Sequence, residues 1–536
     1  MTGENIRDTG PDAYRDGTGT YHPPERRVVR GATIRSSREV TVDAVVVGSG
    51  AGGAPVAKEL AEGGMRVAIL EEGDWQDADD LTAGPRDMTI RLYRDAGQVA
   101  TIGTPPIIVP TGRAVGGTTL INSGTCFRTP DAVLERWRRE YGLELDLDPF
   151  FRRVERELNV SQVPADLAGR NAEVVRRGAE ALGVSHGYLY RNVRGCVGSG
   201  VCAYGCPTSA KQHVGITYIP KAWGAGATTY TGTRVLRIEV RGGRATAVTA
   251  RTNGGGTLRV RADQVIIAAG ALQTPLLLAR NGLGSGSGEL GRNLALHPAT
   301  AGRAVFDEEI VMWEGVPQSF YVDELASDGI MLEGIAGPPE YIAMTLARAG
   351  NEHRELMLKA KHLAMFGVMV CDTARGHLAK VAGRPVIRYD LHPDDAMAFA
   401  RGFELLARIW FAAGAREVVV PVGGVPTLTG GDTTPLREAR VRPRDLTVMG
   451  FHPLGTARAG ADAAHAVLDG DLQVHGVEGL YVSDASAIPS SLGVNPQITI
   501  MALASRLAYG LLGKTPPHDE PEPAHLPHPP AAHAVA

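Results

Sequence analysis

A glycine-rich loop near the start of the chain constrains the fold more than any other feature. The segment DAVVVGSGAGGAPVAKELAEGG at 43–64 places Gly48, Gly50 and Gly53 in the spacing G-x-G-x-x-G. The apolar run before the loop is typical of a buried parallel strand, and the residues after it predict a helix. Between a strand and a helix, such glycines permit a tight turn and the close approach of a pyrophosphate. Together with Ala51, they predict a dinucleotide-binding site.

Glu71 restricts which dinucleotide can bind. It ends the next apolar run, VAILE, 23 residues after Gly48. A carboxylate at this distance accepts hydrogen bonds from the adenosine ribose, and its negative charge repels a 2′-phosphate. We therefore expect FAD or NAD and exclude NADP, whereas the loop alone does not choose between the first two.

Composition excludes several classes of function. The chain has 536 residues, 43% of them hydrophobic and 21% charged, so it can bury more than one core. It contains 55 Lys and Arg residues against 59 Asp and Glu residues, and the formal net charge of −4 disfavours a nucleic-acid partner. No apolar run approaches the roughly 18 residues that span a bilayer, and the first residues are too polar for a secretory signal. The sequence therefore predicts a cytoplasmic protein without a membrane segment.

The two ends of the chain differ from its middle. Residues 1–40 are polar and carry Gly and Pro without a period, which predicts a polar N-terminal arm before a fold that begins near Val42. Residues 515–536 include seven prolines and predict a disordered Pro/His/Ala tail. In between, short apolar runs at 42–47, 66–70 and 264–268 predict parallel strands, and the alternating segment 228–260 predicts a small antiparallel meander.

Four blocks downstream of the glycine loop carry a family resemblance. They are GRAVGGTTLINSGTCFRTP at 112–130, AAGALQTPLLLARNGLG at 268–284, FHPLGTARAG at 451–460 and GLYVSDASAIPSSLGVNPQITIMALASR at 479–506. In order and spacing, these blocks and the glycine loop resemble the glucose-methanol-choline (GMC) oxidoreductase family. The resemblance implies an α/β flavoenzyme in which a Rossmann-type FAD-binding domain adjoins a substrate domain built on an antiparallel sheet.

The resemblance also implies where the domains lie. The FAD-binding domain is expected to be discontinuous, because the family blocks are separated by long segments without them. Its expected segments are 41–130, 226–300 and 441–514, and those of the substrate domain are 131–225 and 301–440, which include a Cys-rich loop at 195–212.

Several residues are expected around the cofactor. Gly116 and Gly117 let backbone amides approach the flavin or its phosphates, and Asn122 offers an amide near the ring. Asp484 matches a carboxylate that the family uses against the ribityl and pyrophosphate groups. The remaining expected contacts are Val235, whose backbone meets the adenine, together with Ala485 and Pro496. Relatives attach the flavin through a histidine before the glycine pair, and TIGTPPIIVPTGRAVGG contains none, which predicts non-covalent FAD.

His452 and Asn495 carry the chemistry that the resemblance implies. An alcohol gives up a hydride to flavin N5 only as its hydroxyl proton leaves, and a neutral imidazole suits the role of general base. We therefore expect His452 to be the base. Asn495 can hold the substrate oxygen and share its developing negative charge, although many relatives have a second histidine there. His297, in LALHP, matches a family segment on the flavin side of the fold and receives no role.

Three of the five cysteines lie within eleven residues. Cys196, Cys202 and Cys206 form the pattern C-x5-C-x3-C-P in a Gly-rich loop. Their spacing resembles the electron-transfer loop of bacterial glucose and gluconate dehydrogenases in the family, which implies a three-iron, four-sulfur cluster and a partner that accepts electrons. Two alternatives stay open, namely reduced thiols packed under the loop and a zinc site with His213 as fourth ligand.

Together these features predict an FAD-dependent oxidation of an alcohol to a carbonyl, with dioxygen or an electron-acceptor protein taking the electrons. The Ala-, Arg- and Gly-rich composition resembles actinobacterial proteins and suggests a sugar-like or aminoglycoside-type substrate, as in antibiotic biosynthesis. Acidic stretches at 306–309 and 321–324 are compatible with a cationic ligand, although such runs are more often solvated faces. An iron–sulfur sugar or polyol dehydrogenase and a flavoprotein lyase of the same fold are the alternatives.

Overall fold

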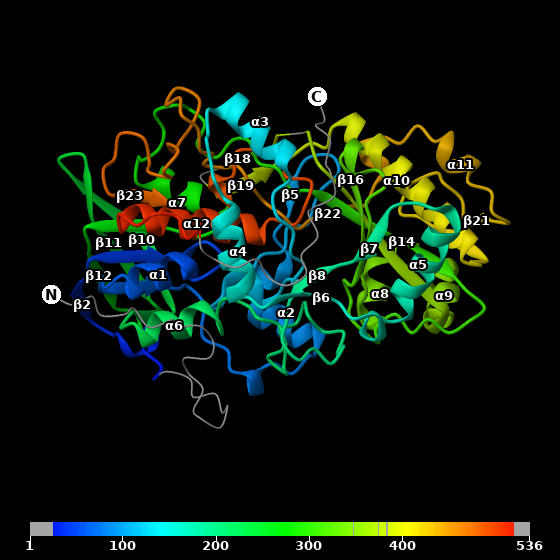
Figure 1. Cartoon of the computed structure of the whole chain (residues 1–536), viewed down its shortest axis with the longest axis horizontal. Coiled ribbons are helices and arrows are strands. Elements are labelled where there is room, and N and C mark those ends of the chain that lie inside the picture. Colours follow the sequence, from blue (N-terminus) through cyan, green and yellow to red (C-terminus); the bar gives the residue numbers. More distant parts are fainter. Residues whose placement is uncertain (1–24, 347, 374, 382–383, 519–536) are drawn as a thin grey trace.

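The chain forms two apolar cores that lie side by side along its longest axis (Figure 1). The computed structural model describes residues 25–346, 348–373, 375–381 and 384–518. One core is built around a parallel sheet and the other around an antiparallel sheet. This arrangement confirms the α/β fold class, in which a Rossmann-type domain adjoins a second domain on an antiparallel sheet.

A parallel sheet of six strands forms the first core. Across the sheet the strands are β1 (Val28–Arg30), β9 (Thr228–Thr231), β4 (Val67–Leu70), β3 (Ala44–Val47), β13 (Gln264–Ile267) and β23 (Leu480–Val482). Strands β3 and β4 are buried along their whole length, as expected for strands covered on both faces. Helix α1 (Gly53–Glu62) packs on both, and α6 (Tyr218–Gly224) and α12 (Gln497–Leu511) pack on α1. The three predicted parallel strands are thus confirmed.

A smaller sheet lies beside the parallel one. Strands β10 (Thr233–Arg241), β11 (Arg244–Thr252) and β12 (Thr257–Arg261) run antiparallel, and β2 (Ser37–Thr41) adds a parallel edge to β12. This confirms the predicted meander, except that the first residues of its range form β9 of the parallel sheet.

The prediction of an N-terminal arm is wrong for residues 25–40. Val28 pairs with Thr229 at the edge of the parallel sheet, and Ser37 pairs with Thr257. Glu39, on β2, also accepts a hydrogen bond from Arg259. The polar composition misled the prediction because these edge strands are largely exposed and their partners lie about 200 residues away. Residues 1–24 lie outside the described part of the chain, as does the predicted tail from residue 519 onward.

An antiparallel sheet forms the second core. Its strands, in order, are β21 (Leu428–Thr429), β20 (Glu417–Val419), β14 (Pro298–Val305), β17 (Leu363–Val370), β16 (Ile330–Gly334), β15 (Phe320–Val322) and β7 (His186–Tyr188), and β22 (Met449–Gly450) also pairs with β14. Helix α10 (Pro393–Ala412) packs on β14, β16 and β17 with the buried rings of Phe403 and Trp410, and α5 (Arg170–Leu182) packs on α10. The face of this sheet that α10 does not cover borders a cavity.

The remaining helices and strands pack around the two cores. They are α2 (Pro85–Leu92), α3 (Asp131–Tyr141), α4 (Asp148–Glu157), α7 (Thr274–Arg280), α8 (Pro339–Thr345), α9 (Gly350–Leu358), α11 (Thr434–Arg437), β5 (Thr101–Ile102), β6 (Val160–Gln162), β8 (Tyr190–Asn192), β18 (His377–Val381) and β19 (Arg384–Arg388). Helix α4 packs against α12, and α6 packs against α1. The range 131–225, which we assigned to the substrate domain, therefore contributes to both cores.

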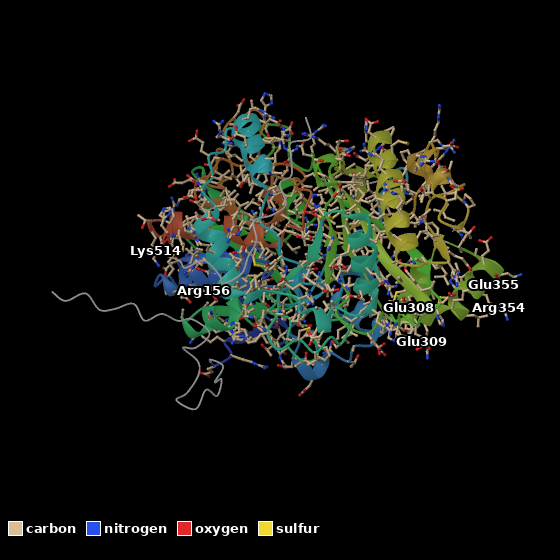
Figure 2. All side chains as sticks on the ribbon, turned by 45° about the vertical axis from the view of Figure 1, so that its right-hand side comes forward. Arg156, Glu308, Glu309, Arg354, Glu355 and Lys514 are labelled. Atoms are coloured by element: carbon tan, nitrogen blue, oxygen red, sulfur yellow. The ribbon has the colours of Figure 1, made fainter. Side chains whose placement is uncertain are left out.

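Charged side chains lie mainly at the periphery, as Figure 2 shows for Glu308 and Glu309. Glu308 pairs with Arg170 and Arg177, which makes this acidic stretch part of a solvated face. Within the described ranges, no helix has both the length and the apolarity needed to cross a membrane.

Candidate active site

A cavity of about 1570 Å³ is lined by residues of both cores. It exceeds the roughly 300–1,000 Å³ of ordinary small-molecule sites, so it has room for a dinucleotide together with a substrate. Most of the residues predicted for the cofactor and for catalysis line it, namely Gly48, Gly50, Ala51, Glu71, Gly117, Asn122, Val235, His452, Asp484, Ala485, Asn495 and Pro496. Of the predicted set, Gly53 and Gly116 do not line the cavity.

Three glycines pack the loop between β3 and α1. Gly48 has a φ of +107°, and a Cβ on it would lie 2.1 Å from the carbonyl oxygen of Ala268. A Cβ on Gly53 would lie 2.0 Å from the carbonyl oxygen of Gly48. Gly52, which the spacing motif does not include, is the tightest, because a Cβ there would lie 1.6 Å from the carbonyl oxygen of Ser483. No side chain fits at these positions.

Gly50 instead faces open space at the N-terminus of α1. The nearest atom to a Cβ on Gly50 would be the Cα of Gly117, at 3.8 Å. The first N–H groups of a helix have no partners within the helix, and the helix dipole attracts an anion there. Loop and helix thus form a cradle of the size and polarity that a pyrophosphate needs. The residues at this site therefore fit the pyrophosphate of FAD.

Glu71 is a buried carboxylate directly behind this cradle. Its Oε2 accepts hydrogen bonds from Ser49 Oγ at 2.6 Å and from the Ser49 amide at 3.1 Å, and its Oε1 accepts one from the Gly73 amide at 2.8 Å. Burial raises the pKa of Glu71, and these three hydrogen bonds offset part of that rise. A carboxylate has about four acceptor positions, so Glu71 holds the loop and keeps one position for a ribose hydroxyl.

Asn122 lies on the cavity wall and is braced from behind. Its Nδ2 donates to Gln497 Oε1 at 2.9 Å, and its Oδ1 accepts from the Gly124 amide at 3.1 Å. The ammonium group of Lys211, which is fully buried, donates to the carbonyl oxygens of Asn122 and Leu120 at 2.6 and 2.8 Å. The wall segment is therefore fixed by hydrogen bonds from the Cys-rich loop.

Asp484 lies on the cavity wall, after β23. Its carboxylate accepts hydrogen bonds from the Gly270 amide at 2.9 Å, from Thr274 Oγ1 at 2.5 Å and from the Ser486 amide at 2.8 Å. Burial raises the pKa of Asp484, and these donors counteract the rise. The carboxylate joins two segments of the parallel-sheet core at the cavity.

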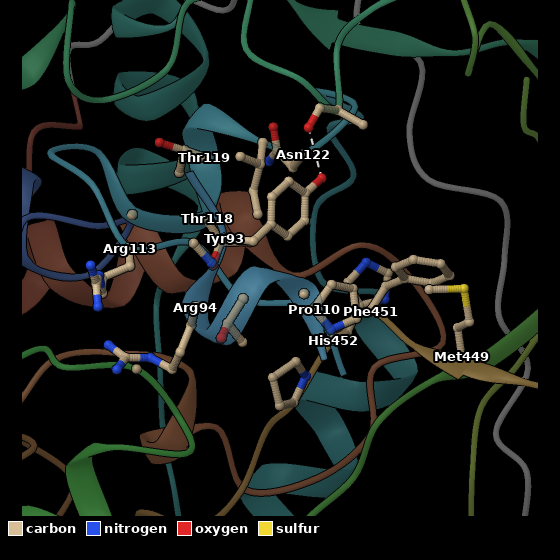
Figure 3. Close-up of a pocket in the computed structure, with 18 of the residues that line it drawn as sticks. Tyr93, Arg94, Pro110, Arg113, Thr118, Thr119, Asn122, Met449, Phe451 and His452 are labelled. Atoms are coloured by element: carbon tan, nitrogen blue, oxygen red, sulfur yellow. Dashed lines mark hydrogen bonds between the residues drawn. The ribbon is translucent and has the colours of Figure 1, made fainter. Parts of the chain in front are cut away.

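His452 follows β22 and lies beside Phe451 and Met449 on the cavity wall (Figure 3). Its Nδ1 is 3.1 Å from Nδ1 of His297, a fully buried residue. The other ring nitrogen of His297, Nε2, accepts from the amides of Leu492 and Gly493 at 2.9 and 3.3 Å. Burial lowers the pKa of His297 to about 3, and burial together with His297 lowers that of His452 well below its usual value. Both rings are therefore neutral near pH 7.

Glu333, on β16, lies on the same wall as the predicted pair. Asn495 Nδ2 is 3.4 Å from Glu333 Oε2 and 3.5 Å from His452 Nε2. Gln318 also donates to Glu333 Oε2, at 2.7 Å. Glu333 Oε1 and Asn495 Oδ1 are buried and have no partner among the described residues. Burial raises the pKa of Glu333 to about 7, and the hydrogen bond from Asn495 lowers it only in part.

Sequence reasoning missed Glu333 and gave His297 no role. His297 stands in a block with family-like residues and has a φ of +44°, which its two backbone donors hold in place. Glu333 lies in IMLEGIAG, where no motif marks it, and only the pairing of Glu333 with Gly367 in the sheet brings it to the cavity.

The cysteines of the Cys-rich loop have separate hydrogen-bond surroundings in the structure. Within the part of the chain that the structure describes, no group of three His, Cys, Asp or Glu residues is placed to hold a metal ion. Cys202 Sγ accepts a hydrogen bond from Arg191 at 3.1 Å, and Cys206 Sγ accepts one from the Lys211 amide at 3.4 Å. Cys196 is partly exposed.

The buried ammonium of Lys211 explains this arrangement, because it occupies the space under the loop and donates to the carbonyl oxygen of Cys202. Burial alone would raise the pKa of the Cys202 thiol, but Arg191 and Lys211 outweigh it and lower that pKa. His213, the predicted fourth zinc ligand, accepts instead from the Gly215 amide. The alternative of packed, reduced thiols fits the structure, whereas the iron–sulfur and zinc predictions receive no support from it.

Comparison with known proteins decides the family. Residues 89–299 and 373–504 match the GMC oxidoreductase family, over its N-terminal and C-terminal parts respectively. An uncharacterised GMC-type oxidoreductase of Mycobacterium tuberculosis is 44% identical over 478 residues, which cover 88% of this chain and 76% of that protein. The chain belongs to the GMC oxidoreductase family. It is therefore an oxidoreductase enzyme, and binding of FAD is expected of it.

Other relatives of this GMC oxidoreductase are named for a specific oxidase activity. A long-chain-alcohol oxidase of Arabidopsis thaliana is 28% identical over 89% of this chain and 68% of that protein. The 6'''-hydroxyparomomycin C oxidase of Streptomyces lividus is 26% identical over 94% of this chain and 97% of that protein. Among solved structures, the fold is similar to pyridoxine 4-oxidase, with a TM-score of 0.70 at 20% identity over 88% of this chain and 99% of that one.

Proposed function

We propose that this GMC oxidoreductase oxidises an alcohol to a carbonyl compound, with FAD as cofactor. The observation that supports this best is the group formed by His452, Asn495 and Glu333 on the cavity wall. It presents two buried acceptors without partners beside an imidazole nitrogen. An alcohol hydroxyl is both a donor and an acceptor, so it satisfies such a group where an apolar ligand does not.

The residues that would hold FAD are those that line the nucleotide end of the cavity. The cradle at Gly50 would hold the pyrophosphate, Glu71 the ribose, and the backbone of Val235 the adenine. Asn122 would lie near the flavin ring, and Asp484 would meet the ribityl and pyrophosphate groups. When bound, FAD supplies the acceptor for the hydride that leaves the alcohol carbon. Binding without a covalent bond remains our prediction.

The hydrogen bonds of the two histidines indicate a role for His452 that differs from the one expected from its motif. Nε2 of His297 accepts two amide N–H groups, so the proton of the neutral ring lies on Nδ1. That N–H donates to Nδ1 of His452, which places the proton of neutral His452 on Nε2. We therefore assign His452 Nε2–H as the donor to the alcohol oxygen, where it stabilises the developing negative charge.

Glu333 is then the proton acceptor. Its free Oε1 is available to the hydroxyl, and a pKa of about 7 leaves a large fraction ionised near neutrality. As the C–H bond breaks and its electron pair leaves as hydride, the O–H bond breaks, its proton passes to Glu333 and the C=O double bond forms. Asn495 lies beside both groups, and its Nδ2 donates to Glu333 Oε2, which helps to fix the position of the carboxylate.

The wall around this group favours an alcohol with an apolar chain. It includes Ile335, Ala336, Met369, Met449 and Phe451. The similarity to the Streptomyces lividus oxidase supports the sugar-like substrate that we expected from the sequence. The apolar wall and the similarity to the long-chain-alcohol oxidase support an apolar alcohol, and we propose that class. We also propose dioxygen as the electron acceptor, because these relatives are oxidases.

A substrate panel tests this function. The purified holoenzyme is given 1-alkanols of increasing length, polyols and amino sugars in air, and both the consumption of oxygen and the formation of hydrogen peroxide are measured. We expect activity that rises with chain length. Turnover of amino sugars alone would favour the sugar-like class, and product formed without any electron acceptor would indicate a lyase.

A further inference from the structure

Arg303 is a buried cation in the substrate part of the cavity. It lies on β14, its exposed fraction is 3%, and it lines the cavity. Its Nη1 donates to the carbonyl oxygen of Ala301 at 2.5 Å, and its Nη2 donates to Thr345 Oγ1 at 2.6 Å. Its Nε is buried and has no hydrogen-bond partner among the described residues. Two neutral acceptors thus serve a group with five N–H donors.

No carboxylate of the described residues forms an ion pair with Arg303, and its main electrostatic neighbour is the Tyr341 hydroxyl. Burial lowers the pKa of Arg303 to about 10, which still leaves it cationic at neutral pH. A buried charge without a counter-ion is unfavourable, whereas the same charge facing an anion is stabilised. Glu340 also lines the cavity, but it is exposed and does not pair with Arg303.

Arg303 and Glu333 lie on the same face of the antiparallel sheet. Ala301 and Glu333 both pair with Gly367, so the three residues form one row across β14, β17 and β16. Arg303 stands two residues further along β14, and side chains two apart point to the same face. With strands about 4.8 Å apart and a rise of about 3.4 Å per residue, the Cα atoms of Arg303 and Glu333 are about 12 Å apart. The cation and the proposed reacting group therefore face the same cavity from separate positions.

Three large apolar side chains of the cavity lining are exposed. Ile90, Ile108 and Met344 line the cavity and are exposed to 60%, 39% and 74%. Exposed large apolar side chains in a cavity lining favour an apolar ligand. Tyr93 and Tyr204 line the cavity nearby, and the Tyr93 hydroxyl donates to the carbonyl oxygen of Ala203 (Figure 3).

We propose that Arg303 is an anion subsite of this cavity, and that the substrate is an amphiphilic alcohol with a hydroxyl at one end, an apolar chain, and an anionic group at the other end. This inference rests on the proposed alcohol oxidation for the hydroxyl, while the anion subsite itself rests on Arg303 alone. A terminal carboxylate and a terminal phosphate share the chemistry that a guanidinium recognises.

A binding experiment tests the subsite without turnover. The oxidised holoenzyme is titrated with decanoate, decyl phosphate and 1-decanol by calorimetry. Because a hydrogen bond to a charged group is worth more than a neutral one, we expect the better of the two anions to bind about 10-fold to 100-fold more tightly than 1-decanol. The tighter anion identifies the terminal group. Equal or weaker binding of both anions would overturn the proposal.

Variants localise the effect. Arg303→Met should reduce the advantage of the anion to about 3-fold or less, and Arg303→Lys, which keeps the charge without the bidentate fork, should keep an intermediate advantage. Arg139→Met, at an exposed arginine outside the cavity, is the matched control and should keep the full advantage. If Arg303→Met does not fold, the wild type and Arg303→Lys still decide the result. An anion that keeps its full binding advantage over 1-decanol in Arg303→Lys at high salt would contradict a charge contact.

Turnover gives a second readout. We expect the wild type to oxidise ω-hydroxydecanoate with a higher kcat/KM than its methyl ester, mainly through a lower KM, because the anion is bound in the ground state and in the transition state alike. Oxidation of both at equal kcat/KM would overturn the anion subsite and leave alcohol oxidation intact. Tight binding of decanoate without any oxidation would retain the subsite and contradict the proposed function.

Discussion

The sequence predicts the place of His452 at the cavity but not that of Glu333. His452 lies in a block with a family resemblance, and the structure brings it to the cavity as expected. Glu333 has no motif around it, and only its register opposite Gly367 places it beside Asn495. A role that depends on which ring nitrogen carries a proton is also out of reach of a sequence, because it is set by the two amides that donate to His297.

At this scale, the pH dependence of flavin reduction tests Glu333. The pKa of Glu333 is raised to about 7, so its ionised form increases as the pH rises through that value. Asn495 and Gln318 donate to its carboxylate, and the pKa of His452, whose Nε2 is 3.5 Å from Asn495 Nδ2, is too low for it to titrate in this range. We expect the rate of anaerobic reduction to rise with pH through about 7 in the wild type.

In Glu333→Gln the rate should fall by about 100-fold or more and lose this dependence, since a positioned general base contributes at least that factor. Glu309→Gln at the surface is the control and should behave as the wild type. An unchanged pH profile in Glu333→Gln would assign the proton to another group.

Replacement of the oxygen-binding side chains separates their roles. His452→Ala removes a hydrogen-bond donor to the developing negative charge, so flavin reduction should slow by about 100-fold or more. Asn495→Ala should cost about 10-fold to 100-fold, because it leaves both the donor and the acceptor in place. Stopped-flow absorbance at full FAD occupancy measures both rates. A His452→Ala enzyme with the wild-type rate would remove His452 from the reaction.

The elements differ in how much of them the sequence predicts. The strands β3, β4 and β13 are continuous apolar runs, and their burial on both faces explains why composition alone identifies them. The edge strands β1 and β2 are short or polar and are held by distant partners, so composition led to the wrong expectation of an arm. In the Cys-rich loop, the spacing of the cysteines does not reveal that the buried Lys211 ammonium donates to the carbonyl oxygen of Cys202, and the cluster there stays a prediction.

Glu71 tests the turn that joins β3 to α1. The Glu71 carboxylate accepts all three of its hydrogen bonds, two at Oε2 and one at Oε1. Glu71→Gln replaces one of these oxygens with an N–H₂ group, which cannot accept, so at least one N–H or O–H donor loses its partner. We expect the dissociation constant for FAD to rise by about 10-fold to 100-fold, with little change in the rate of reduction at saturating FAD. Fluorescence titration of the apoprotein measures the first, and Glu135→Gln, an exposed residue on α3, is the control. Loss of the chemical step at full occupancy would place Glu71 nearer the reaction than proposed.

The whole molecule was predictable in outline because the family blocks imply two domains, while the sharing of residues 131–225 between the cores came from packing alone. The cavity between the cores draws on distant parts of the chain, from Val47 to Ile500. Loss of the fold should therefore release a cofactor that no covalent bond retains. Denaturation and ultrafiltration should yield free FAD in the filtrate, and yellow flavin kept on the precipitated chain would contradict non-covalent binding.

Anaerobic reduction of the bound flavin tests the central claim most directly. The FAD-loaded enzyme is mixed with a long-chain alcohol in the absence of oxygen, and the flavin absorbance is followed while the carbonyl product is quantified. Our account predicts that the flavin bleaches with one carbonyl formed per flavin, and that the bleaching is slowed in His452→Ala and Glu333→Gln. A flavin that stays oxidised with every alcohol tested, in an enzyme with full FAD and an intact fold, would contradict it.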